Sequence, residues 1–318
     1  MIRRLAVSTL GSAPVWALLR RLRRQPDALT ILCYHTLGPD QDGIEGWTTL
    51  RESDFLAQLA DLQAHYDIVG LEDGLAGAPG SARPRAVVTF DDGDRGLYHH
   101  LLPILRKNPF PVTLYIATAQ FETGKAFWFD RVVNALQSPT DVVVPGLGRR
   151  TVPGGGGKIH WQAIQPILEA LKQAPQEARD DLADQIVAQG APPATPGLGP
   201  MSRDQLKEIA DTPGVTIGAH SHGHELLDQL PLEKATASMA RSRDLLKDWT
   251  GQAVRHFAFP NGNHTGPLRA AAKSLGFASA TVLEDRIAPR GADSFALPRI
   301  SVGRYDSRAR VRLRLVGL

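Results

Sequence analysis

Runs of residues typical of buried strands alternate along this chain with runs typical of amphipathic helices. The first strand-like run covers residues 28–34, and a helix-like run with apolar residues at helical spacing follows over residues 53–66. This order recurs, and it is what parallel α/β folds require. The other expected helices cover residues 97–106, 201–210, 232–249 and 266–275, and the other expected strands cover residues 112–117, 214–217 and 255–259, with short strands near residues 278 and 296.

One strand-like run, residues 86–90, leads directly into two carboxylates, Asp91 and Asp92, and then into Gly93. Neighbouring side chains on a strand point to opposite faces, but a glycine lets the backbone bend, so both carboxylates could line one pocket. One could hold a metal while the other acts as a base. The alternative is that both merely cap the helix expected from residue 97, since aspartate is favoured at helix N-termini and turns.

A second polar cluster follows the strand-like residues 214–217. It contains His220, His222 and His224 within five residues. Imidazole and carboxylate suit zinc and similar ions, and a catalytic zinc site usually has three protein ligands and an open position for water. His220, His224 and one of the two aspartates would supply that set. His222 is explained equally well as a polar residue with no ligand role.

In their order along the chain, these motifs resemble the polysaccharide deacetylases of carbohydrate esterase family 4, also called the chitooligosaccharide deacetylase domain. The resemblance rests on residues 89–93 (Thr-Phe-Asp-Asp-Gly), on the His-Ser-x-x-His motif at 220–224, and on residues 257–262 (Phe-Ala-Phe-Pro-Asn-Gly). It spans roughly residues 28–302. It implies a distorted (β/α) barrel, with seven strands as the expected number, and an active site at the carboxyl ends of the strands.

The resemblance also implies a role for each motif residue. Asp91 would be the general base, and Asp92 would bind the metal together with His220 and His224. The backbone amide of Asn261 would donate to the oxyanion. A divalent metal, most simply zinc, with cobalt or nickel as alternatives, would polarise an amide carbonyl and activate water. The substrate would be an N-acetylated saccharide that loses its acetyl group by hydrolysis.

The chain departs from the commonest family pattern at the residue that orients the base. Many members carry an arginine two residues before the proline of the third motif, and this chain has Ala258 there. Arg299, on a late strand-like run, is our candidate replacement. The alternative is that Arg299 is an ordinary surface ion-pair partner.

A second departure concerns the general acid. Many members carry a late histidine for this role, and none follows His264 here. His35, at the end of the first strand-like run, is similar in position to the early histidine of a biofilm-polysaccharide deacetylase subgroup, and it could protonate the leaving amine. The alternative is a buried histidine bonded to the backbone.

Residues 121–200 interrupt the alternation with glycine- and proline-rich stretches. We expect an insertion of helices and a turn that overhangs the site. Trp128, in an aromatic cluster of this region, could stack on a sugar or could simply belong to the core. Phe259 and Pro260 of the third motif are the other residues expected to contact substrate.

Both ends of the chain are basic, although the net charge is only +3. In residues 1–27, six arginines precede the first acidic residue, and an apolar run between them is too short to span a bilayer. That run ends in arginines instead of a cleavage site, so a cytoplasmic or peripherally membrane-associated protein is expected. The segment could be an amphipathic helix on anionic lipid, with Trp16 at the lipid boundary, or a solvated basic helix.

The basic residues 303–318 are expected to form a tail or an edge strand, which positive charge would protect from aggregation. Nucleic acid is not an expected partner, because no aromatic-interleaved basic motif accompanies either end. The 318 residues, 42% of them hydrophobic, are enough for a barrel with an insertion, and the single Cys33 excludes an intramolecular disulfide. No oligomeric state is predicted.

Three other functions compete with deacetylation of a glycan. A deformylase or deacetylase of a small or lipid-linked sugar would suit the basic N-terminus. A glycan-binding barrel without catalysis would keep the fold, although the intact pairing of Asp91 with the metal set argues against it. A two-metal nuclease or phosphatase would need more carboxylates than the motifs supply.

Overall fold

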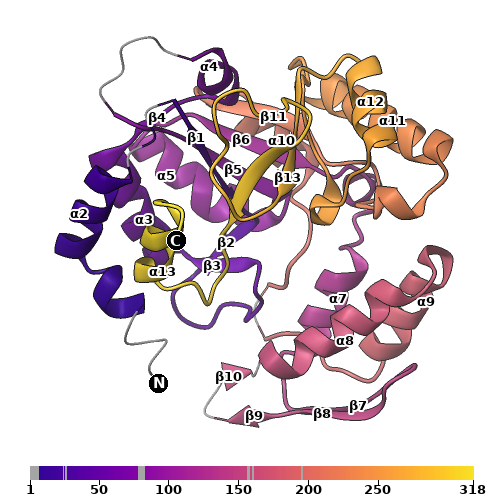
Figure 1. The fold of residues 1–318 in the computed structure, drawn as a ribbon. Helices are drawn as coiled ribbons and strands as arrows, with labels where there is room; N and C mark the ends of the chain where they lie inside the picture. Colours follow the sequence, from indigo (N-terminus) through magenta and orange to yellow (C-terminus); the bar gives the residue numbers. More distant parts are fainter. Residues whose placement is uncertain are drawn as a thin grey trace.

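The computed structural model describes residues 7–318 except 24, 26, 78–82, 156–157, 160 and 195. Its centre is a closed barrel of seven parallel strands with helices around it (Figure 1). The barrel closes because β1 pairs with β14 along one edge and with β5 along the other. The predicted distorted (β/α) barrel of seven strands is therefore confirmed. In pairing order the strands are β1 (Leu29–Tyr34), β14 (Leu297–Ser301), β13 (Ser279–Leu283), β12 (His256–Ala258), β11 (Val215–Ala219), β6 (Val112–Ile116) and β5 (Arg85–Asp92).

Strand β5 is the longest strand of the barrel, and all eight of its residues are buried. Such near-continuous burial is typical of parallel strands that are covered on both faces. Within β5, Val87 packs with Tyr115 and Leu297 in the cluster inside the barrel, whereas Val88 and Phe90 belong to the larger core between barrel and helices. The alternation of side chains along a strand therefore assigns Asp91 to the barrel interior.

Short strands and helices complete this part of the molecule. Strand β4 (Asp67–Ile68) pairs with the start of β5, and β2 (Thr36–Gly38) pairs with β3 (Thr49–Arg51) just beyond the end of β1. The remaining helical elements here are α3 (Glu52–His65), α4 (Leu71–Ala76), η1 (Leu97–Leu101), α5 (Leu102–Lys107), α10 (Arg203–Ala210), η2 (Leu227–Gln229), α11 (Leu232–Thr250), η3 (Pro260–Gly262) and α12 (Gly266–Ser274).

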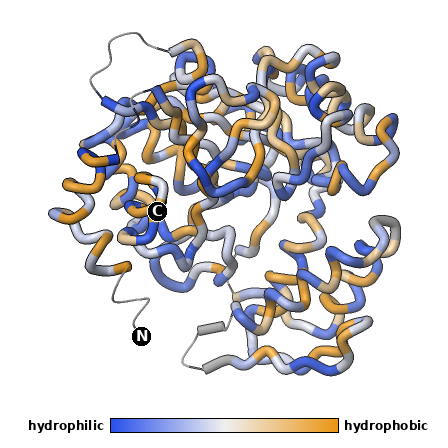
Figure 2. The backbone as a smooth tube through the Cα atoms, viewed as in Figure 1, coloured by the Kyte–Doolittle hydropathy of each residue, from blue (hydrophilic) through white to orange (hydrophobic). Residues whose placement is uncertain are grey.

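The chain between β6 and α10 leaves the barrel and forms a separate lobe with its own apolar core (Figures 1 and 2). Val132, Val142, Ile164 and Ile186 lie in this core, and Ile44 from the loop before β3 joins them. The lobe contains the region expected as an insertion. The short helix α6 (Ala119–Thr123) still packs on the barrel core through Phe121. The elements of the lobe are α7 (Trp128–Ala135), β7 (Thr140–Val144), β8 (Gly148–Val152), β9 (Gly154–Gly155), β10 (Lys158–Ile159), α8 (Trp161–Gln173) and α9 (Gln176–Val187).

Two terminal helices, α2 (Ala13–Leu22) and α13 (Arg308–Arg314), lie close together on the barrel (Figure 1). Trp16 is only 1% exposed, and the guanidinium of Arg312 lies 5.0 Å from its ring. The expectation that Trp16 sits at a lipid boundary is therefore wrong, because its ring is enclosed by protein. The edge strand considered for the C-terminus is also wrong, since residues 308–314 are helical. No helix in the described part of the chain is long and apolar enough to span a bilayer.

Of the six early arginines, Arg3, Arg4 and Arg24 lie outside the described residues.

The C-terminal helix is held by one buried carboxylate. Asp61 of α3 accepts two hydrogen bonds from Arg308, each 2.7 Å long, and two from Arg312, each 2.8 Å long. We expect Asp61→Asn to lower the free energy of unfolding by about 2 kcal/mol, because charge-assisted hydrogen bonds to a buried group are lost. Chemical denaturation followed by tryptophan fluorescence measures this, with the exposed Asp248→Asn on α11 as the matched control.

Acid should remove the same contribution. Burial raises the pKa of the Asp61 carboxyl, but hydrogen bonds from Arg308 and Arg312 outweigh it, so the pKa lies below its ordinary value. The stabilisation is therefore present above the ordinary aspartate pKa of about 4 and is lost as the pH falls through the lower folded-state value. Equal stability of Asp61→Asn and wild type at neutral pH would contradict this account.

Candidate active site

A cavity of about 760 Å³ lies at the carboxyl ends of the barrel strands, under the α8 helix of the lobe. The barrel and its loops supply one side of it, and the lobe supplies the other. The lining residues from the barrel side are His35, Trp47, Thr48, Asp91, Asp92, His220, His224, Asn261, Leu283 and Tyr305, and those from the lobe are Phe129, Trp161, Gln162, Gln165, Leu168, Glu169 and Lys172.

The three predicted metal ligands, Asp92, His220 and His224, converge in this cavity. The Asp92 Oδ1 atom lies 3.2 Å from His224 Nε2 and 3.6 Å from His220 Nε2. Two zinc ligands at about 2.0–2.1 Å from the ion, in tetrahedral geometry, would lie about 3.3 Å apart. Asp92 Oδ1 is also buried without a hydrogen-bond partner. The spacing and the unpartnered oxygen both fit a divalent cation held by these three side chains.

The backbone holds His220 in the orientation that a ligand needs. Its Nδ1 lies 2.7 Å from the carbonyl oxygen of Ala258. Because a carbonyl only accepts hydrogen bonds, Nδ1 carries the proton and Nε2 presents its lone pair to the cavity. Burial lowers the pKa of His220 to about 4, so the ring is neutral at physiological pH.

At the other two predicted ligands, Asp92 and His224, the attraction between the two side chains outweighs the effect of burial on each pKa. Burial raises the pKa of Asp92, but His224 outweighs it and brings the pKa well below the ordinary value. Burial lowers the pKa of His224, and here Asp92 outweighs it, so the pKa is raised. The opposite shifts show that Asp92 and His224 attract each other electrostatically, and a metal ion held between them would bind the neutral imidazole and the ionised carboxylate.

Left-handed backbone conformations aim these side chains. Of the six non-glycine residues with positive φ in the described chain, four belong to the motifs: Asp92 (76°), Ser221 (61°), His224 (53°) and Asn261 (55°). Such conformations are unfavourable for most residues and cluster at functional sites. We expected the bend after β5 at Gly93, but it already begins at Asp92. This bend turns Asp92 out of the strand's alternation and into the cavity beside Asp91.

Asp91 is bound by Arg299, the arginine that we proposed from the sequence. Arg299 donates from Nη1 and Nη2 to the two oxygens of Asp91, both at 2.6 Å, and from Nη1 to Thr89 Oγ1 at 3.1 Å. The guanidinium is fully buried and lies 5.3 Å from the centre of the Tyr115 ring. Its burial excludes the alternative of a surface ion pair. Burial raises the pKa of Asp91, but Arg299 and then His220 outweigh it, so the pKa lies below its ordinary value and the carboxylate stays ionised.

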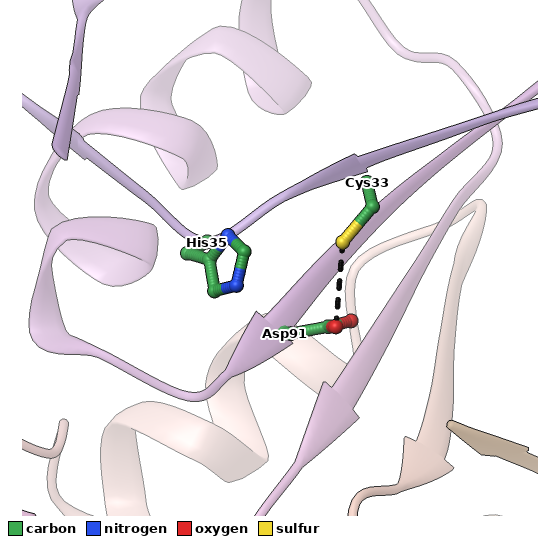
Figure 3. A group of neighbouring side chains, drawn as sticks. All are labelled: Cys33, His35 and Asp91. Carbon is green, nitrogen blue, oxygen red and sulfur yellow. Dashed lines mark hydrogen bonds between the residues drawn. The ribbon is translucent and has the colours of Figure 1, made fainter. Parts of the chain in front are cut away.

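Figure 3 shows a second group of side chains with metal-binding atoms, Cys33, His35 and Asp91. It fits a cation less well. Both oxygens of Asp91 already accept from Arg299, and the Cys33 thiol donates to one of them over 3.3 Å. Burial raises the pKa of that thiol well above its usual value, so it remains protonated. We therefore assign the cation to the first group.

His35 lines the cavity near Asp91 and has its ring 5.5 Å from that of Trp47, edge to face. Its Nδ1 is buried and makes no hydrogen bond in the described structure, so the alternative of a histidine bonded to the backbone through this atom does not hold. An imidazole in this position is placed to exchange a proton with a bound substrate.

The structure corrects the predicted substrate contacts. Phe259 is fully buried and packs on Phe257, and Pro260 is also buried, so their side chains do not line the cavity. Trp128 lies in the lobe, where its ring packs against Phe129 and faces the Arg179 guanidinium, so the alternative of a core residue describes it better. Asn261 does line the cavity.

Other aromatic residues take their place at the cavity wall. Trp47, Trp161 and Tyr305 line it, and sequence reasoning missed all three. Their segments lie far apart in the chain: a backbone hydrogen bond from Arg304 to Trp47 joins the first and last on the barrel side, and the folding of the lobe over the barrel adds Trp161. Residues 161, 165, 168, 169 and 172 recur at helical spacing, a signal that could have marked one functional face of α8.

His222 points away from the metal group. Its Nδ1 is 2.9 Å from Thr118 Oγ1 and its Nε2 is 3.5 Å from Glu122. The interpretation of His222 as a polar residue without a ligand role agrees with this placement.

Comparison with known proteins points in one direction. The family model for polysaccharide deacetylases matches residues 79–280. The fold is similar to the Streptococcus pyogenes deacetylase PplD in complex with acetate, with a TM-score of 0.61, 18% identity, and coverage of 91% of this chain and 99% of that one. It is also similar to IcaB from Ammonifex degensii, with a TM-score of 0.58, 21% identity, and coverage of 91% and 97%. No curated protein sequence matches significantly.

The first metal group can be tested without any substrate. We expect His220→Ala to weaken zinc binding by more than roughly 100-fold, because even changes outside the ligand shell cost 10–100-fold. Equilibrium dialysis with metal analysis by mass spectrometry measures the affinity. His222→Ala, two residues away but outside the group, is the matched control and should bind zinc like the wild type. Unchanged binding in His220→Ala would refute the ligand assignment.

Proposed function

Because this chain belongs to the polysaccharide deacetylase family, we propose that it is a metal-dependent hydrolase that removes N-acetyl groups from an N-acetylated glycan or glycoconjugate. The observation that carries the proposal is the adjacency of two differently paired carboxylates. Asp92 shares its oxygen with two histidines, while Asp91 is bound by Arg299. Two aspartates in sequence thus have environments suited to two roles.

We assign the metal to Asp92, His220 and His224, with zinc as the first candidate and cobalt or nickel as alternatives. When bound, the ion would polarise the acetyl carbonyl and lower the pKa of a bound water. The donor set of two imidazoles and one carboxylate would leave one position open on a tetrahedral ion, and expansion to five ligands would admit the water and the carbonyl oxygen together.

Asp91 then acts as the general base. It takes a proton from the water as the oxygen attacks the carbonyl carbon, and Arg299 keeps the carboxylate ionised and fixed in orientation. The backbone amide of Asn261, at the cavity wall, is the proposed donor to the oxygen that gains negative charge.

His35 is the proposed general acid. As the bond between the carbonyl carbon and nitrogen breaks, it gives a proton to the departing amine, so the products are acetate and a free amino sugar. In this proposal the chain would share the early histidine of the biofilm-polysaccharide subgroup that its sequence resembles. It is supported by the position of His35 in the cavity, near Asp91.

The cavity suits a saccharide of more than one unit. Its volume is within the range of ligand pockets, and aromatic side chains from three segments line it beside polar groups on α8. Trp47 and Tyr305 belong to the barrel side and Trp161 to the lobe. We propose that the sugar ring stacks on these aromatic faces while its N-acetyl group enters the metal site.

Release of acetate and of formate from a panel of N-acylated mono- and oligosaccharides tests the activity, with zinc or cobalt added. We expect metal-dependent acetate release that falls by about 10²–10⁴-fold in Asp91→Asn, because general base catalysis is lost. Metal content should stay at the wild-type level, since Asp91 is not a ligand in this assignment. Preferential formate release would favour a deformylase. Near-wild-type turnover by Asp91→Asn would contradict the assignment of Asp91 as the general base.

A second experiment addresses the saccharide path. We expect Trp161→Ala to lower kcat/KM for an N-acetylated oligosaccharide by about tenfold, because a stacking surface is lost. Hydrolysis of a small activated acetyl ester should change little, since such a substrate reaches only the metal end of the cavity. Trp128→Ala, on the same lobe but away from the cavity, is the matched control. An equal loss on both substrates would mean that Trp161 supports the fold instead.

A further inference from the structure

A second cavity, of about 320 Å³, lies beside the N-terminal helix α2. Its walls include Ala28 and Thr30 near the start of β1 and Pro84 just before β5, so it opens near the amino ends of the barrel strands. The cavity of the candidate active site is at the carboxyl ends, and the two cavities share no lining residue. The second cavity is therefore a separate feature, and any role of it is independent of the proposed function.

The lining of this second cavity is strongly cationic. Arg20, Arg21, Arg23 and Arg83 contribute to it together with His65, and among its lining residues there is no aspartate or glutamate. Of the cavity's arginines, Arg83 is paired with Asp67, and Arg23 donates to the carbonyl oxygens of Val316 and Gly317. The nearby Asp61 holds Arg308 and Arg312. The positive charges of Arg20, Arg21 and Arg23 thus converge without a carboxylate in the cavity wall, which is the electrostatic pattern of an anion site.

Arg20 is partly buried and lies near other positively charged side chains. Its Nε is buried and makes no hydrogen bond in the described structure, and its guanidinium lies 4.5 Å from the centre of the Trp16 ring. Burial lowers the pKa of Arg20; Tyr66 and Asp61 raise it, Arg312 and Arg83 lower it, and the net shift is downward. An anion in the cavity would relieve this repulsion and could accept from the guanidinium.

Exposed leucines lie next to these cations on the same helix. Leu18 is 56% exposed and Leu22 is 73% exposed, and the two are one helical turn apart on α2. The opposite face of α2 is fixed to the protein by the buried Trp16. Figure 2 shows apolar residues along this helix at the edge of the molecule. The helix therefore presents an apolar stripe to the solvent beside a cationic cavity.

We propose that α2 and this cavity form a peripheral membrane-docking site for anionic phospholipid. The arginines of the cavity receive the phosphate of a lipid headgroup, and Leu18 and Leu22 enter the boundary between headgroups and acyl chains. Interfacial helices bind through such a combination of apolar area and basic residues. A second copy of this chain fits the surface less well, because a symmetric contact would bring arginines against arginines.

Docking in this way would leave the carboxyl ends of the barrel strands, with their cavity, turned away from the bilayer. It also accounts for the N-terminal arginines, which the hydrolytic chemistry does not use.

Co-sedimentation of the purified chain with vesicles tests the proposal. We expect binding to vesicles that contain phosphatidylglycerol and little binding to vesicles of phosphatidylcholine alone. Arg21→Glu should weaken the binding by about tenfold or more, since each basic residue near an anionic surface contributes measurably. Leu22→Ser should weaken it by about tenfold, because the apolar contact with lipid is lost.

Two matched controls separate docking from general effects. Arg150→Glu changes an exposed arginine of the lobe, and Leu232→Ser changes an exposed leucine of α11. Both should bind vesicles like the wild type. Arg21 and Leu22 are themselves exposed, so their variants should fold, and circular dichroism together with unchanged hydrolysis of a soluble activated ester verifies this.

A titration with inorganic phosphate distinguishes the lipid from a free anion. Phosphate should compete with anionic vesicles, and Leu22→Ser should keep its phosphate affinity while losing vesicle binding. Phosphate binding that depends on Arg21 without any preference for anionic vesicles would overturn the proposal in favour of a soluble anion. Absence of both kinds of binding, or equal loss in the control variants, would overturn it altogether.

Discussion

The paired hydrogen bonds between Arg299 and Asp91 organise both the barrel and the candidate site. Removing two charges from water is expensive, and their attraction offsets the expense only where the geometry is good and the other polar atoms find partners. Here both carboxylate oxygens accept at 2.6 Å, and Thr89 and Cys33 add hydrogen bonds, but the Nε atom of Arg299 is buried without a partner in the described structure. A buried pair of this kind is weak evidence for stability, so its value here is positional. It fixes the orientation of one carboxylate to within the narrow limits that proton transfer requires.

The position of this pair depends on barrel closure. Strand β1 lies between β5 and β14, so Asp91 and Arg299 belong to strands that are two apart and meet across the interior. The family match covers residues 79–280, which includes Asp91 but excludes both His35 on the β1 side and Arg299 on β14. These two residues come from outside the matched range. Closure of the sheet places them beside the matched motif, and an open sheet with the same sequence would leave them apart.

The sequence predicted the fold and the convergence of Asp92, His220 and His224 because both depend on local pattern. Apolar runs that end in Asp91-Asp92 and in the histidine cluster identify strand ends, and parallel strand ends meet at one face of a barrel. Arg299 could be proposed as the arginine that orients the base because this chain has Ala258 where many family members carry that arginine. The misplaced residues depended on distant partners. Trp16 is covered by Arg312, which lies nearly three hundred positions later in the chain. No residue near Trp16 in the sequence predicts that contact. Trp161 faces the site only because the lobe folds back over the barrel.

The two sides of the cavity are built under different constraints. On the barrel side, the side chains that would do the chemistry are fixed by strand pairing, by buried hydrogen bonds and by left-handed backbone at Asp92, His224 and Asn261. On the lobe side, α8 packs on a separate core, and the polar side chains that it turns toward the cavity are not part of that core. Substitutions at these polar positions of α8 can therefore alter which saccharide fits without disturbing the positions of the metal group and the base. In the proposed function, the reaction is accordingly a property of the barrel, and the choice of substrate is a property of the lobe that covers it.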